Sequence, residues 1–86
     1  MTEKLVTITN ETGLHARPAS DFVGFTKMFE NKISLVKGDK TLNAKSILHV
    51  LSLSLKRGDS VMIRVEGDNE METLEKIVKF LEELDD

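Results

Sequence analysis

The segment TGLHARPAS, residues 12–20, concentrates chemically distinctive side chains in one short span. His15, Arg17 and Pro18 lie within four positions, Gly13 precedes them, and Pro18 is the only proline of the chain. Imidazole is mostly uncharged at neutral pH and is then a good nucleophile. A guanidinium is a planar, permanently charged donor that matches phosphate oxygens. This combination predicts phosphoryl chemistry, provided that the fold brings the two side chains to one place.

A helix start is the element that would position them. Apolar residues recur at helical spacing after His15 and predict a helix over residues 16–27. Pro18 fits this helix only in the first turn, where its missing N–H has no intrahelical partner. His15 would then lie at or beside the N-cap, where unpaired N–H groups and the helix dipole favour an anion such as phosphate. Gly13 permits a backbone shape that a larger residue would disfavour.

Other interpretations of His15 remain open at this point. A histidine near a helix start is commonly a polar surface residue or a cap. A metal site is not expected, because His15 and His49 are the only histidines, cysteine is absent and no clustered carboxylates accompany them. A Ser-His-Asp hydrolase is not expected in so small a domain without cleft-forming insertions. No Gly-rich nucleotide loop is present, and no cofactor is expected.

The rest of the chain alternates between strand-like and helix-like patterns. Strands are predicted at residues 4–9, 32–37, 40–43 and 60–66, and further helices at 47–53, after the good N-cap Ser46, and at 71–84. The short apolar run 47–53 fits a strand as well as a helix by pattern alone. The order is βαββαβα, and one apolar face per strand predicts an antiparallel sheet covered on one side, a two-layer α+β domain. The predicted core is Val6, Ile8, Ile33, Leu35, Leu42, Val61, Ile63, Val65, Leu74, Ile77, Val78 and Leu81.

Length and composition limit the function classes. The 86 residues suffice for a single domain, 1–86, and 40% hydrophobic with 31% charged residues suit a globular protein. Neither a signal peptide nor an apolar run of roughly 20 residues is present, so a cytoplasmic protein without membrane insertion is expected. Residues 66–86 carry nine acidic and two basic side chains, which argues against nucleic-acid binding. Residues 1–65 have a net charge of +4, which could attract an acidic partner protein. The alternative for the acidic tail, residues 66–86, is that it is simply the solvated face of a helix.

Two stretches resemble one known family. TGLHARPAS resembles the active-site signature of the HPr family, the histidine-containing phosphocarriers of the bacterial sugar phosphotransferase system. LNAKSILHVLSLSL, residues 42–55, resembles the regulatory serine region of HPr proteins from Gram-positive bacteria and their relatives. Length and element order agree over the whole chain. The family fold implied is an open-faced β-sandwich, a four-stranded antiparallel sheet of order 1-4-2-3 with three helices on one face.

The resemblance implies a phosphocarrier and not an enzyme. His15 would accept a phosphoryl group on Nδ1 from phosphorylated Enzyme I, which is itself charged by phosphoenolpyruvate, and pass it to the IIA components of sugar permeases. Arg17 would pair with the phosphate, and Pro18 would shape its seat. Ser46 would be phosphorylated by an HPr kinase/phosphorylase, which would suppress transfer through His15 and enable binding to a catabolite-control transcription factor. A known regulatory paralogue lacks the histidine, which this chain retains.

The second stretch also offers a docking surface. If Ile47, Leu48 and Leu51 project outward from a short helix, they make an apolar patch beside the charged site. Residue 49 is a departure, because the family more often has glycine or a basic residue where this chain has His49. The partner-binding residues expected are Thr12, Ala16, Ser20, Ile47, Leu48, His49 and Leu51. A monomer is expected, and the competing function is a purely regulatory module that acts through Ser46.

Overall fold

Four strands and three helices follow one another in the order βαββαβα in the computed structural model, which describes residues 1–85. The strands are β1 (Thr2–Thr7), β2 (Lys32–Lys37), β3 (Lys40–Asn43) and β4 (Ser60–Glu66). The helices are α1 (Ala16–Thr26), α2 (Ile47–Ser52) and α3 (Glu70–Glu82). The predicted element order is therefore confirmed, and the ambiguous run after Ser46 is a helix.

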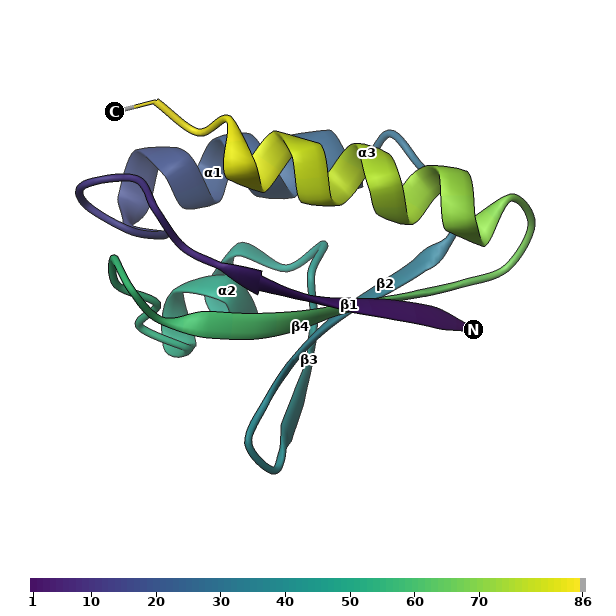
Figure 1. The fold of residues 1–86 in the computed structure, drawn as a ribbon, viewed down its shortest axis with the longest axis horizontal. Coiled ribbons are helices and arrows are strands. Elements are labelled where there is room, and N and C mark those ends of the chain that lie inside the picture. Colours follow the sequence, from purple (N-terminus) through teal and green to yellow (C-terminus); the bar gives the residue numbers. More distant parts are fainter. Residues whose placement is uncertain (86) are drawn as a thin grey trace.

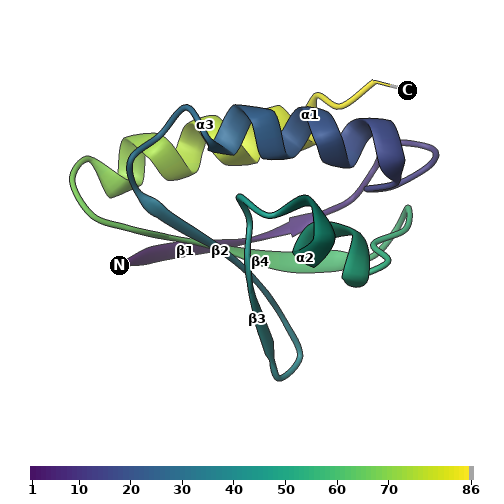
Figure 2. The same ribbon diagram turned by 180° about the vertical axis from the view of Figure 1, so that it is seen from behind.

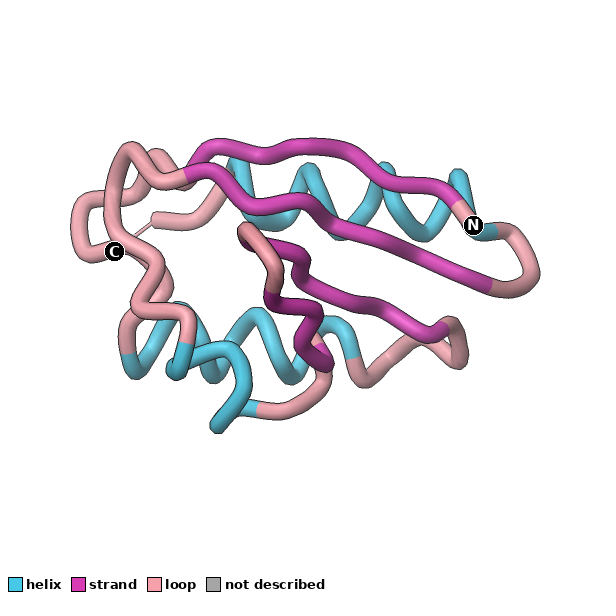
Figure 3. Tube along the Cα trace, turned by 90° about the horizontal axis from the view of Figure 1, so that it is seen from below, coloured by secondary structure: helices cyan, strands magenta, loops and turns pink. Residues whose placement is uncertain are grey.

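The strands form one antiparallel sheet of order β1-β4-β2-β3. The register sets apolar side chains opposite one another on one face, with Val6 paired to Val61 and Ile33 paired to Val65. All four of these side chains are buried. No helix lies in front of the strands in Figure 3, so the face of the sheet turned away from α1 and α3 is open. The sheet order expected from the resemblance and the α+β class are confirmed.

The helical layer lies over one face of the sheet. α1 and α3 run across it side by side in Figures 1 and 2, and the fully buried Phe22 and Ile77 point from them into the core. The rings of Phe25 on α1 and Phe80 on α3 stack at 4.5 Å between centroids, which ties the two helices together. α2 is shorter and packs against α1 and β3. The loops after β1 and after α2 and the end of α3 meet at one end of the molecule (Figure 1).

Some predicted boundaries and core positions are wrong. The first strand was expected at 4–9 but is Thr2–Thr7, because its ladder with β4 pairs Thr2 with Val65. Ile8 lies beyond this strand and is still buried. Leu42 is only half-buried, because β3 is a four-residue edge strand with one neighbour. The last helix ends at Glu82, short of the expected residue 84. Every other residue of the predicted core is buried.

The connection from α2 to β4 is held by one acidic side chain. The carboxylate of Asp59 accepts the backbone N–H of Lys56 at 2.9 Å and forms an ion pair with Lys37 of β2 at 3.4 Å. The carbonyl of Asp59 accepts the N–H of Ile8 at 2.8 Å. The hydrogen bond from Lys56, reinforced by the charge of Lys37, lowers the pKa of the Asp59 carboxyl below its ordinary value of 3.8. The turn before β4 is therefore joined both to Ile8, directly after β1, and to Lys37 at the end of β2.

Replacing Asp59 with asparagine should destabilise the protein at neutral pH and have no such effect in strong acid. A depressed carboxyl pKa contributes stability above the unfolded-state value and loses that contribution as pH falls through the folded-state value. The difference in unfolding free energy between parent and Asp59→Asn should therefore be present at pH 7 and close below pH 3.8. Urea denaturation across this range measures it. Asp39→Asn, in an exposed turn without an ion pair in the described structure, serves as control, and a pH-independent difference for Asp59→Asn would contradict the assignment.

Candidate functional site

His15 is the N-cap residue of α1, as the sequence predicts. Its backbone is extended, with φ −89° and ψ −167°, and its carbonyl accepts the N–H of Ala19 at 2.8 Å. Its side chain forms no capping hydrogen bond and is exposed. The N–H groups of the first helical turn have no intrahelical acceptors and give this end of α1 a partial positive charge. The imidazole is thus free to react at a position that suits an anion.

A tight approach between two backbone segments positions His15. Gly13 has φ +69°, and a Cβ there would lie 2.3 Å from the carbonyl oxygen of Leu55 and 2.8 Å from the Cα of Lys56. The next N–H, that of Leu14, donates to the same Leu55 oxygen at 3.0 Å. The side-chain amide of Asn10 donates to the Gly13 carbonyl at 2.8 Å. The loop before His15 is therefore pressed against the segment that follows α2, and only glycine fits at position 13.

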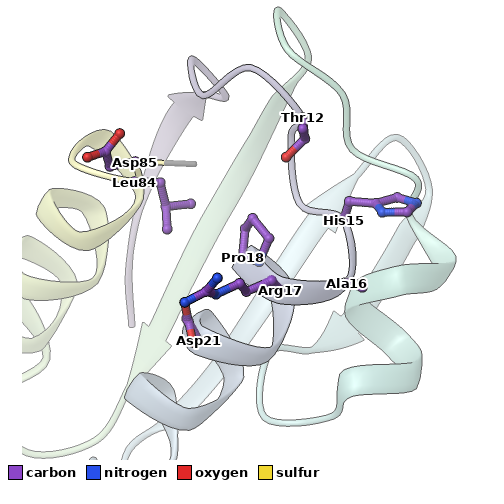
Figure 4. Close-up of a pocket in the computed structure, with 8 residues that line it drawn as sticks. All are labelled: Thr12, His15, Ala16, Arg17, Pro18, Asp21, Leu84 and Asp85. Atoms are coloured by element: carbon purple, nitrogen blue, oxygen red, sulfur yellow. The ribbon is translucent and has the colours of Figure 1, made fainter.

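The first of two hollows beside His15 contains the expected arginine. This cavity of about 530 Å³ is lined by residues from the start of α1 and from the end of the chain: Thr12, His15, Ala16, Arg17, Pro18, Asp21, Leu84 and Asp85 (Figure 4). Pro18 is buried at the third helical position and forms part of the wall, whereas Arg17 is exposed. The cavity thus contains one cation and two carboxylates.

The side chains of His15 and Arg17 extend in opposite directions in Figure 4. The guanidinium is directed toward Asp21, which lies four residues further along α1. The imidazole is directed toward the segment that connects α2 to β4. Arg17 therefore belongs to the His15 site, but its side chain must turn before it can reach a group bound to the ring.

A second hollow lies on the side that the imidazole faces. This cavity of about 480 Å³ is lined by Thr12, Leu14, His15, Ala16, Leu51, Ser54, Leu55 and Lys56. Among the described residues that line it, there is no carboxylate, and Lys56 is the one Lys or Arg. Leu51 of α2 contributes to it, so the apolar patch expected on α2 reaches the histidine. Ser54 adopts a left-handed backbone, φ 50°, which turns the chain at the edge of this hollow.

Ser46 is the N-cap of α2, as expected. Its hydroxyl accepts the N–H of His49 at 3.4 Å, and its carbonyl accepts the N–H of Val50 at 3.0 Å. Only Val50 of α2 is buried. The exposed fractions of Ile47, Leu48 and Leu51 are 36%, 75% and 37%, so the expected outward projection of these three side chains is confirmed. An apolar surface of this kind on a short helix is available to a protein partner.

His49 does not point toward the Ser46 hydroxyl. Its Nδ1 accepts the backbone N–H of Asn43 at 3.1 Å, which fastens the ring to the end of β3. Among the expected partner-binding residues, Thr12, Ala16 and Leu51 share a hollow with His15, whereas Ser20, Ile47, Leu48 and His49 line neither of its two hollows. Ser20 is exposed on α1. Their roles in binding stay predictions.

Three charged residues of the site were not expected from the sequence. Asp21 follows Arg17 at a spacing of four, which is a usable signal on a helix. Asp85 and Lys56 carry no local signal, because distant segments bring them to His15. Within the described residues, no cluster of three metal-ligating side chains occurs, and none of the helices has the length and apolar character of a membrane span.

Comparison with known proteins decides the family. The family model described as "PTS HPr component phosphorylation site" matches residues 2–83. The chain belongs to the HPr family. Phosphocarrier protein HPr of Vibrio cholerae is 39% identical, with 98% of this chain and 99% of that protein covered. The HPr-like protein Crh of Halalkalibacterium halodurans is also 39% identical, with 95% and 98% covered.

Solved structures of the HPr family share this fold. The crystal structure of HPr-C-His from Thermoanaerobacter tengcongensis superposes with a TM-score of 0.90 at 41% identity and covers 95% of this chain and 92% of that one. A crystal structure of Bacillus subtilis Crh, described as a dimer with a swapped domain, has a TM-score of 0.76 at 37% identity and covers 96% and 95%. The expected family membership is therefore confirmed, and the family contains both phosphocarriers and HPr-like proteins of another name.

Gly13→Ala should destabilise the protein by about 2 kcal/mol or more, because the methyl group meets the Leu55–Lys56 backbone at a positive φ. Gly24→Ala is the matched control: nothing lies within 4 Å of a Cβ there, and alanine in a helix should raise stability by about 0.5–1 kcal/mol. Urea denaturation compares the two variants, and equal stabilities would show that the approach at Gly13 does not hold the loop.

Proposed function

We propose that this member of the HPr family is a cytoplasmic phosphocarrier that accepts a phosphoryl group on His15 from phosphorylated Enzyme I and delivers it to IIA components of sugar permeases. The observation that carries the proposal is the exposed His15 side chain at the N-cap of α1, which forms no hydrogen bond with any described residue. A carrier residue must be accessible to two different partners in turn, and an imidazole held by the fold would have to be released each time.

The same phosphoryl-transfer step serves both reactions, first from Enzyme I to His15 and then from His15 to the IIA component. The lone pair of a neutral ring nitrogen of His15 attacks phosphorus, an N–P bond forms, and the bond between phosphorus and the donor group of Enzyme I breaks. The donor group keeps the electron pair of that bond, and it takes up a proton while the other nitrogen of the His15 ring releases one to solvent. The second transfer repeats the step with His15 as donor and the acceptor group of the IIA component as nucleophile. The N–H groups at the start of α1 are already oriented toward negative charge that gathers there.

We also propose that Ser46 is the regulatory phosphorylation site, modified from ATP by an HPr kinase/phosphorylase. Phosphate on an N-cap hydroxyl is compatible with α2, because the helix start favours negative charge. The exposed Ile47, Leu48 and Leu51 would form the docking surface for the kinase and for a catabolite-control transcription factor. Leu51 reaches the His15 hollow, so added charge at the start of α2 acts on the same surface that Enzyme I would use.

A purely regulatory module is the second candidate. The similarity to HPr-like Crh proteins supports it, at 39% identity for the Halalkalibacterium halodurans protein. In that role the chain would act through Ser46 and not through His15. The presence of His15 with Arg17 and Pro18 in one hollow favours the phosphocarrier.

Docking is proposed to be transient and to involve a monomer. The exposed patch is confined to three side chains of a short helix, which suits a small interface with exchangeable partners. The swapped dimer described for Bacillus subtilis Crh is a property of that relative.

Incubation with phosphoenolpyruvate and an Enzyme I should place an acid-labile phosphate on the parent protein and none on His15→Ala. The substitution should change unfolding free energy by less than about 0.5 kcal/mol, because the side chain is exposed and makes no hydrogen bond. Gel separation of the phosphorylated form before and after acid treatment measures the label, and urea denaturation confirms the fold.

Retained labelling in the alanine variant would remove His15 from the mechanism. A parent protein that takes no label from Enzyme I, yet is phosphorylated on Ser46 from ATP by an HPr kinase, would establish the regulatory module instead. Ser46→Ala is the matched control variant for the experiment with ATP and the HPr kinase.

Arg17→Ala should slow transfer in both directions by roughly tenfold or more without abolishing it, because the guanidinium stabilises phosphate charge while the ring remains the nucleophile. Rapid-quench kinetics with Enzyme I and with a IIA domain measure the two steps. Transfer at the parent rate in both steps would mean that Arg17 remains turned toward Asp21 throughout.

A further inference from the structure

The two sides of His15 differ in charge. On one side, Arg17 shares its hollow with the carboxylates of Asp21 and Asp85, and its guanidinium is directed toward Asp21 (Figure 4). On the other side, the described residues that line the hollow include Lys56 and no carboxylate. The imidazole points toward this second side. A dianionic group on the ring would therefore first meet the hollow that Lys56 lines, although the charge of Lys56 also acts on the Asp59 carboxylate.

Lys56 is held beside His15 by its backbone. Its N–H is fixed by the Asp59 carboxylate at 2.9 Å, and its Cα lies where a Cβ on Gly13 would collide at 2.8 Å. The preceding carbonyl, that of Leu55, accepts the Leu14 N–H at 3.0 Å. These contacts fasten the residue to the loop that carries the histidine, although the two are far apart in the chain.

The ammonium group of Lys56 is available for a bound anion. It forms no ion pair in the described structure, and the side chain is exposed. The carboxylate of Asp59, in the same loop, is already engaged by the Lys56 backbone and the Lys37 ammonium. A long, flexible lysine side chain that starts at the edge of the hollow can follow a phosphoryl group as it arrives and leaves.

We propose that Lys56 is a second phosphoryl-binding cation of the His15 site, acting from the side opposite Arg17 on the group that the ring carries. This inference rests on the proposed function of His15. In the unphosphorylated protein Arg17 is directed toward Asp21, so Lys56 supplies the first positive charge, and Arg17 adds to it once its side chain turns. Both cations stabilise the negative charge of the transferring group, and the N–P bond still forms at the ring alone.

Phosphoramidate allows a test without a protein partner. It donates its phosphoryl group to histidine and releases ammonia, so the rate depends on the ring and its surroundings and not on docking. Lys56→Gln should slow this phosphorylation by roughly three- to tenfold, the range expected for one unit charge acting on a nearby anion in a solvated site. ³¹P NMR of the phosphohistidine follows the reaction, and urea denaturation checks that the variant folds normally.

Neighbouring substitutions make the test specific. Arg57→Gln removes the same charge one residue further along, at a side chain that lines neither His15 hollow, and should react near the parent rate. Lys56→Arg should restore the rate. Raising the salt concentration from about 0.05 M to about 0.5 M should narrow the difference in phosphorylation rate between Lys56→Gln and the parent protein, because exposed charges are screened.

The outcomes separate the two hypotheses. If Lys56→Gln and Arg57→Gln are phosphorylated by phosphoramidate at the same rate, Lys56 is not a phosphoryl-binding residue. The same conclusion holds if the rate difference between Lys56→Gln and the parent protein does not change with salt. Neither result depends on whether His15 is the carrier. If His15→Ala reacts with phosphoramidate and Enzyme I as fast as the parent, the proposed function itself fails. Slowing in Lys56→Gln alone, with recovery in Lys56→Arg, supports the assignment.

Discussion

The approach of Gly13 to the Leu55–Lys56 backbone is the constraint on which the site depends. It joins a loop near the start of the chain to the segment after α2, through the Leu14 to Leu55 hydrogen bond of 3.0 Å. The buried side chain of Leu14 anchors the same loop in the core, directly beside His15. With the approach in place, the helix start, the apolar patch of α2 and Lys56 form one continuous surface around His15.

Charge is distributed unevenly over this surface. The start of α1 supplies partial positive charge, and Arg17 and Lys56 supply full charges on opposite sides. The end of the acidic tail approaches from the Arg17 side through Asp85. Nearby carboxylates compete with phosphate for a guanidinium, and they also keep the empty site from holding free anions strongly. An arrangement of this kind suits a group that must be accepted and then given away.

Local signals in the sequence were sufficient for the elements and for the reactive residues. His15 as N-cap, Pro18 in the first turn and Ser46 as the second cap all follow from residue types that have few conformational alternatives. The edge of the sheet was less predictable, because Leu42 has an apolar neighbour on one side only. Lys56 and Asp85 could not be assigned to the site, because they reach it only through tertiary contacts between segments that are far apart in the sequence. The direction of the Arg17 side chain, away from the His15 ring, likewise has no signal in the spacing of the two residues.

Within the described residues, no hydrogen bond holds the His15 side chain, and this has a thermodynamic consequence for the proposed carrier role. A folded protein whose cargo-bearing group is not part of its own bonding network breaks none of its hydrogen bonds when the cargo arrives or leaves. No part of the energy of the bond between cargo and protein is then consumed in releasing the ring. What the next acceptor must overcome is only the attraction between the cargo and the side chains that gather round it.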